Sequence, residues 1–163
     1  MPEPYRKESI DNKILYPICK EISRKYCKNI DPNEITIVNF ILGIIIIYYL
    51  YKTKFHLPIE KKIIVLLLLT LRAILDGLDG TVARMYEKTS KLGAILDEWS
   101  DIIFFAGLIL IIFFESKIYS LFLFFLFLTY YLKLDTDYIT ILHDNTLLVT
   151  PLIILIMFIL KNK

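Results

Sequence analysis

The chain has 163 residues, a formal net charge of +2 and a 56% share of hydrophobic residues. Soluble domains are about 45–50% apolar, so this composition favours a membrane protein over an ordinary soluble domain. The two cysteines, Cys19 and Cys27, belong to no CxxC motif or Cys/His cluster, which excludes a zinc site and a disulfide framework of the usual kinds.

The first segment, residues 5–28, is polar but patterned. Isoleucines recur every four residues, and this spacing predicts one apolar stripe along a helix with Lys and Arg mostly elsewhere. We expect residues 1–31 to form an amphipathic helix lying on the membrane surface, since it is basic and precedes apolar segments. The alternative is a solvated helix packed on the protein itself. Pro17 should kink the helix or split it. The stripe consists of Ile10, Ile14, Ile18 and Ile22.

A helix start is predicted at Asp31-Pro32-Asn33, because Asp or Asn caps helices and Pro suits the first turn. Five apolar segments follow, joined by short connections, and a membrane span needs about 20 mainly apolar residues. The sequence therefore predicts an all-α, polytopic transmembrane helix bundle over residues 32–163. Seven Lys or Arg lie within residues 1–30, which places the N-terminus in the cytoplasm. The segments are residues 33–53, 60–84, 91–114, 117–133 and 145–160.

Four aspartates lie where the second apolar segment ends and the third begins. Asp76 and Asp79 are three residues apart and Asp97 and Asp101 are four apart, so each pair shares a helix face. A short loop makes the two helices antiparallel, and we expect the four carboxylates to converge between them. Such acids are costly in a membrane and are functional by default. All-oxygen ligands suit Mg²⁺, Mn²⁺ or Ca²⁺, and two such ions would balance four carboxylates.

The same stretch resembles the CDP-alcohol phosphotransferase signature, D-x2-D-G-x2-A-R-x8-G-x3-D-x3-D. All eight fixed positions are filled, and the turn Asn33–Thr36 with Pro32 before it is similar to the entrance of the family's first span. The resemblance implies six spans where we count five, and a homodimer. The eight positions are Asp76, Asp79, Gly80, Ala83, Arg84, Gly93, Asp97 and Asp101.

The resemblance also implies roles for these residues. Asp76 and Asp97 would bridge two Mg²⁺ or Mn²⁺ ions, Asp79 would bind the first ion, and Asp101 would touch the second and act as general base. The implied reaction is attack by an alcohol on a CDP-linked lipid, with CMP leaving. Residues expected to hold the CDP-linked donor are Asn33, Thr36, Gly80, Ala83, Arg84 and Ser90.

The acceptor alcohol is the least determined feature. A phosphorylated acceptor needs a second anion site, but no arginine follows Arg84, and Lys133 and His143 are the only candidates in the C-terminal half. This favours serine or another unphosphorylated amino alcohol, with glycerol phosphate or inositol phosphate as alternatives. The expected partners are membrane lipid, the donor and the acceptor, and not nucleic acid. We expect a multi-pass protein whose active site faces the cytoplasm. Two other classes stay open: an inactive scaffold and a cation-binding transporter.

Overall fold

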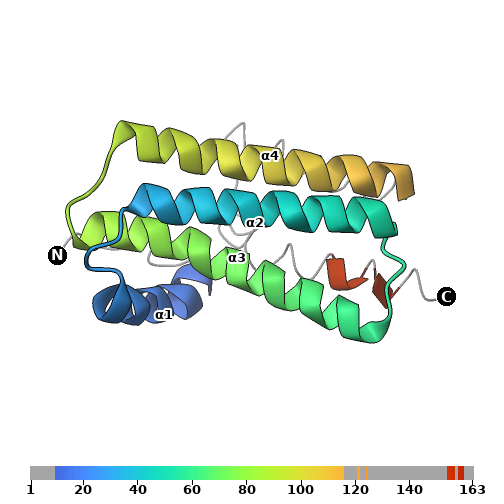
Figure 1. The fold of residues 1–163 in the computed structure, drawn as a ribbon, viewed down its shortest axis with the longest axis horizontal. Helices are drawn as coiled ribbons and strands as arrows, with labels where there is room; N and C mark the ends of the chain where they lie inside the picture. Colours follow the sequence, from blue (N-terminus) through green and yellow to red (C-terminus); the bar gives the residue numbers. More distant parts are fainter. Residues whose placement is uncertain (1–9, 116–120, 122–123, 125–153, 157, 160–163) are drawn as a thin grey trace.

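Four long helices make up the fold. The computed structural model describes residues 10–115, 121, 124, 154–156, 158 and 159, and every regular element in these ranges is helical. Helix α2 packs against both α3 and α4, and α1 packs against α3. Figure 1 shows α2, α3 and α4 running side by side in alternating directions, with α1 against one end of α3. The helices are α1 (Ile10–Tyr26), α2 (Pro32–Thr53), α3 (Ile59–Met85) and α4 (Lys91–Glu115).

These bounds confirm the first three apolar segments within one or two residues. The predicted helix start is also confirmed: the Asp31 side chain accepts a hydrogen bond of 2.9 Å from the Asn33 N–H, and Pro32 occupies the first turn. Helix α3 ends at Met85, and Glu87 just beyond it adopts a left-handed φ of 54°. The predicted segments 117–133 and 145–160 lie almost entirely outside the described residues, as do Lys133 and His143.

Helix α1 differs from its prediction in two ways. It is one continuous helix through Pro17, not a split one, because Pro17 lies on its exposed side, where the carbonyl that loses its N–H partner can be solvated. The face that packs against α3 is also not the isoleucine stripe, since Ile14 and Ile18 are 50% and 44% exposed. The buried face of α1 consists of Leu15, Cys19, Ser23 and Cys27.

Both alternatives for α1 are therefore partly met. The helix packs on the protein through smaller side chains, which allow a close approach to α3, and it leaves Ile14 and Ile18 uncovered. The exposed isoleucines lie near basic residues such as Lys20 and Lys25, which are also exposed. This distribution is typical of a helix at a membrane surface.

The α1–α3 contact is closest at Gly77. A Cβ on Gly77 would lie 3.2 Å from the Cys19 sulfur, and the Cys19 thiol donates a hydrogen bond of 3.5 Å to the Ile74 carbonyl. Burial raises the pKa of Cys19 to about 11, and the negative charges of Asp79 and Asp76 raise it further. The thiol is therefore protonated at neutral pH and unreactive, because the thiolate is the nucleophile.

We expect Gly77→Leu to push α1 away from α3 and to expose this thiol. Alkylation by iodoacetamide at pH 8, followed by mass spectrometry, should leave Cys19 largely unlabelled in the native protein and label it much faster in Gly77→Leu. Gly77→Ala is the matched control, since its single methyl group meets only the movable thiol. Equal protection of Cys19 in Gly77→Leu and the native protein would contradict the packing.

The two hydrophobic clusters lie at opposite ends of the bundle. One joins α1 to α3 beside the aspartates and includes Leu15, Leu78 and Val82. The other lies where α2 turns into α3 and is centred on residues of α2, α3, α4 and the C-terminal segment, such as Leu50, Leu108 and Phe158. In this second cluster the buried Lys62 ammonium donates a hydrogen bond of 3.1 Å to the Phe158 carbonyl.

One helix in the described part of the chain, α2, is long and apolar enough by composition to cross a membrane. Helices α3 and α4 are longer, with 27 and 25 residues against 22, but they carry charged residues within their apolar stretches. The all-helical class is thus confirmed, and the arrangement of five or six spans stays a prediction.

Candidate active site

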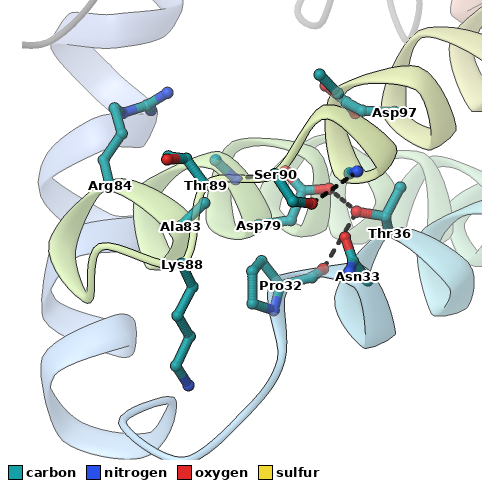
Figure 2. A pocket seen from close by; sticks show the side chains of 13 residues that line it. Pro32, Asn33, Thr36, Asp79, Ala83, Arg84, Lys88, Thr89, Ser90 and Asp97 are labelled. Carbon is teal, nitrogen blue, oxygen red and sulfur yellow. Dashed lines mark hydrogen bonds between the residues drawn. The ribbon is translucent and has the colours of Figure 1, made fainter.

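A cavity of about 210 Å³ lies where α2 begins, α3 ends and α4 begins. Figure 2 shows side chains from all three helices and from the loop between α3 and α4 around it. All six residues expected to hold the donor line this cavity, together with two of the four aspartates. The lining consists of Pro32, Asn33, Thr36, Asp79, Gly80, Ala83, Arg84, Lys88, Thr89, Ser90, Gly93, Ala94 and Asp97.

Two cations lie near the cavity in different situations. Figure 2 shows Lys88 and Arg84 extending in opposite directions. The Lys88 ammonium donates to the Ile30 carbonyl at 2.9 Å and fastens the loop to the segment before α2. The Arg84 guanidinium lies over Gly80, where a Cβ would come within 3.2 Å of Nη1. Arg84 makes no hydrogen bond or ion pair within the described ranges, so its planar fork is free to bind a phosphate.

Helix α2 holds both aspartates of α3. The Thr36 hydroxyl donates a hydrogen bond of 2.6 Å to Asp79 Oδ2, and Asp79 Oδ1 accepts from the Gly80 N–H. The Asn39 amide donates to Asp76 Oδ1 at 3.1 Å. Hydrogen bonds to a carboxylate are about twice as strong as neutral ones. The two bonds therefore fix the orientation of both carboxylates relative to α2.

Sequence analysis missed Asn39. It is completely buried, and it is a polar residue within an apolar helix, three positions after Thr36 and so on the same face. A lone amide in an apolar segment that already carries Thr36 on one face was the available signal.

We expect Thr36→Val to lower activity or Mn²⁺ affinity about 10- to 100-fold, as changes beside metal ligands commonly do. The change is nearly isosteric and removes the 2.6 Å bond to Asp79. Thr70→Val is the matched control, because the Thr70 hydroxyl donates only to the Leu66 carbonyl of its own helix. Equal behaviour of the two variants in steady-state kinetics and Mn²⁺ titration would rule out a role for the Thr36–Asp79 bond.

The aspartates of α4 have unlike surroundings. Asp101 Oδ1 accepts a hydrogen bond of 2.7 Å from Arg72 Nη2 on α3. Asp97 Oδ1 is buried and has no hydrogen-bond partner in the described part of the chain. Glu98 and Trp99, between them, are exposed and face away from the cavity, as their positions on the helix predict.

The donor set fits a hard divalent cation. Asp76 lies close enough to the other three aspartates for their charges to act on it, and the charges of Arg72 and Arg84 leave the four carboxylates only partly compensated. All ligands are oxygens, as Mg²⁺ and Mn²⁺ prefer. Among the residues that the structure describes, however, no three such side chains are close enough to hold an ion, because three of the four turn towards protein donors. The two-ion site remains a prediction.

The predicted convergence is modified in one respect. We expected the carboxylates to meet between two adjacent helices, whereas α2 packs against both α3 and α4. The aspartates thus belong to a three-helix site in which the first turns of α2 supply their hydrogen-bond partners.

Comparison with known proteins agrees with this geometry. Residues 29–160 match the family model described as CDP-alcohol phosphatidyltransferase. Since the match covers most of the chain, the protein belongs to this family. Proteins of the family are embedded in membranes and use divalent metal ions.

Its curated relatives come from heat-loving microorganisms. The chain is 37% identical over 84 residues to a bifunctional IPC transferase and DIPP synthase of Thermococcus kodakarensis, covering 52% of this chain and 18% of the relative. It is 35% identical over 72 residues to an archaetidylinositol phosphate synthase of Pyrococcus horikoshii, covering 44% and 35%. A bifunctional relative from Archaeoglobus fulgidus is 33% identical over 101 residues, covering 60% and 19%. The chain thus spans about a third or less of these relatives' length, and no solved structure matches it.

Proposed function

We propose that this protein transfers a phosphate-linked lipid group from a CDP-linked donor to the hydroxyl group of an alcohol and releases CMP. The observation that carries the proposal is the single cavity lined by Asn33, Thr36, Gly80, Ala83, Arg84 and Ser90, with Asp79 and Asp97 on its wall. The cavity is the natural place for the nucleotide, and the unpaired Arg84 fork suits its diphosphate.

In this proposal Asp76, Asp79, Asp97 and Asp101 hold two divalent ions, Mg²⁺ or Mn²⁺. Bound there, the ions would neutralise the diphosphate and the charge that develops on departing CMP. Thr36 and Asn39 orient the carboxylates of Asp79 and Asp76. Asp101 accepts the hydroxyl proton as the alcohol oxygen bonds to the lipid-bearing phosphorus, and the bond from that phosphorus to CMP breaks.

For the acceptor we propose inositol phosphate. The support is the name of the Pyrococcus horikoshii relative, an archaetidylinositol phosphate synthase, since nothing in the comparisons favours serine. The sequence argument for an unphosphorylated acceptor rested on the lack of arginine after Arg84. Serine and glycerol phosphate are kept as arms of the test.

We further propose that α3 and α4 cross the membrane beside α2, with the aspartate end at the cytoplasmic face and α1 at the surface. The support is the antiparallel packing of the three helices, the exposed Ile14 and Ile18, and the basic N-terminal segment. The family resemblance implies a homodimer, which light scattering of the detergent-solubilised protein would test.

The test is CMP release by the purified full chain from a CDP-linked lipid with Mg²⁺ or Mn²⁺. Separate reactions contain inositol phosphate, glycerol phosphate, serine or no acceptor. We expect CMP release with inositol phosphate that stops when EDTA removes the metal. Release with serine alone would replace the acceptor. No release with any acceptor would reject the reaction and favour a scaffold or a cation-binding transporter.

A further inference from the structure

Arg72 is a buried cation next to the site that none of the roles above uses. It lies one helical turn before Asp76 on α3, and its side chain is 4% exposed. Nη2 donates to Asp101 Oδ1 at 2.7 Å, so the ion pair joins α3 to α4. The partner carboxylate belongs to the residue proposed as general base.

Three helices enclose the guanidinium group. Its carbon lies 3.9 Å from the centroid of the Phe104 ring on α4, within range of a cation–π contact. On the α2 side, a Cβ on Gly43 would lie only 3.4 Å from Arg72 Nε. The absence of a side chain at Gly43 therefore leaves the space that the guanidinium fills, and the surrounding contacts hold it in one orientation.

The ion pair is poorly explained by stability alone. Removing two charges from water costs several kcal/mol for each ion, and apolar residues of similar volume often replace a buried pair without loss. Arg72 Nε is also buried without a hydrogen-bond partner among the described residues. So are Asn39 Oδ1, Asp97 Oδ1 and Ser100 Oγ, which lie on the same three helices. Unsatisfied buried polar atoms are rare in proteins and call for a functional explanation.

The contact engages one Asp101 oxygen and leaves the other. Within the described ranges, Asp101 Oδ2 has no hydrogen-bond partner, and the Asp101 side chain is 18% exposed. A carboxylate fixed through one oxygen presents the second in a defined direction. We propose that Arg72 is a positioning residue that holds Asp101 Oδ1 so that Oδ2 is directed towards the metal and the acceptor hydroxyl. This inference rests on the role of Asp101 in the proposed function.

The test is a double-mutant cycle on Mn²⁺ affinity, measured by electron paramagnetic resonance with the purified full chain. In the native background we expect Asp101→Asn to weaken Mn²⁺ binding about 10- to 100-fold. In the Arg72→Met background the same change should cost no more than about 3-fold, because Asp101 is no longer directed at the ion and coupled residues are not additive. An equal cost of Asp101→Asn in both backgrounds would overturn the inference.

Two further variants keep the test decisive. Lys62→Met removes another buried cation from α3 whose partner is the Phe158 carbonyl, so the full cost of Asp101→Asn should persist in that background. Arg72→Lys keeps the charge but places a flexible ammonium where a planar fork was. If Arg72→Met does not fold, the cost of Asp101→Asn in Arg72→Lys should still be below the native value, and an unreduced cost rejects the inference.

Kinetics separate this inference from the proposed function. We expect Arg72→Met to lower kcat for CMP release about 10- to 100-fold, below the full contribution of a general base, with KM for the donor within about 3-fold. A native protein that binds Mn²⁺ and shows the coupling but releases no CMP would reject the reaction and leave the positioning role standing. CMP release without coupling would reject the positioning role alone.

Discussion

Replacing Asp101 by asparagine should lower kcat for CMP release by about 10²- to 10⁴-fold, the usual contribution of a general base. Asparagine keeps the size of the side chain but cannot accept the proton of the attacking hydroxyl. It also removes the charge that pairs with Arg72 at 2.7 Å. Steady-state CMP release with saturating donor, acceptor and Mn²⁺ measures the effect.

Glu98→Gln is the matched control for Asp101→Asn. Glu98 lies on the same helix, three residues earlier, and undergoes the same acid-to-amide change, but it is exposed and faces away from the cavity. We expect it to retain native activity. Full activity in Asp101→Asn would reject Asp101 as the base, and an equal loss in both variants would indicate a general charge effect on α4.

Gly93→Ala should raise KM for the CDP-linked donor about tenfold, which corresponds to about 1.4 kcal/mol of binding free energy. A Cβ on Gly93 would lie 2.7 Å from Asn33 Oδ1 and 3.0 Å from Ser90 Oγ. Both side chains line the cavity, so they must shift within it. The aspartates keep their partners, and kcat should therefore stay within about 3-fold of the native value.

The chain offers a matched control for this change in the same helix. A Cβ on Gly107 would lie 2.7 Å from Ile47 Cδ1, an equally close contact far from the cavity. Gly107→Ala should lower the melting temperature through overpacking, which costs about 1–3 kcal/mol, and leave KM unchanged. An unchanged KM in Gly93→Ala, or a matching rise in Gly107→Ala, would contradict the assignment of the cavity to the donor.

The local features of the fold follow from the sequence. Apolar segments and breakers predicted α2, α3 and α4 within one or two residues, because hydrophobic length and capping residues such as Asp31 act within a single helix. The aspartate spacing of three and four residues likewise assigns each pair to one helix face. The family signature placed the donor-binding candidates, and the structure gathers them around one cavity.

Contacts between helices could not be predicted in this way. Periodicity identifies a face but not the helix that meets it, so the face of α1 that packs on α3, the place of α2 against both α3 and α4, and the role of Asn39 appear only in the structure. The four aspartates themselves were evident from sequence. Their partners on other helices, Thr36, Asn39 and Arg72, were decided by the tertiary structure, because a hydrogen bond between helices depends on how the helices pack.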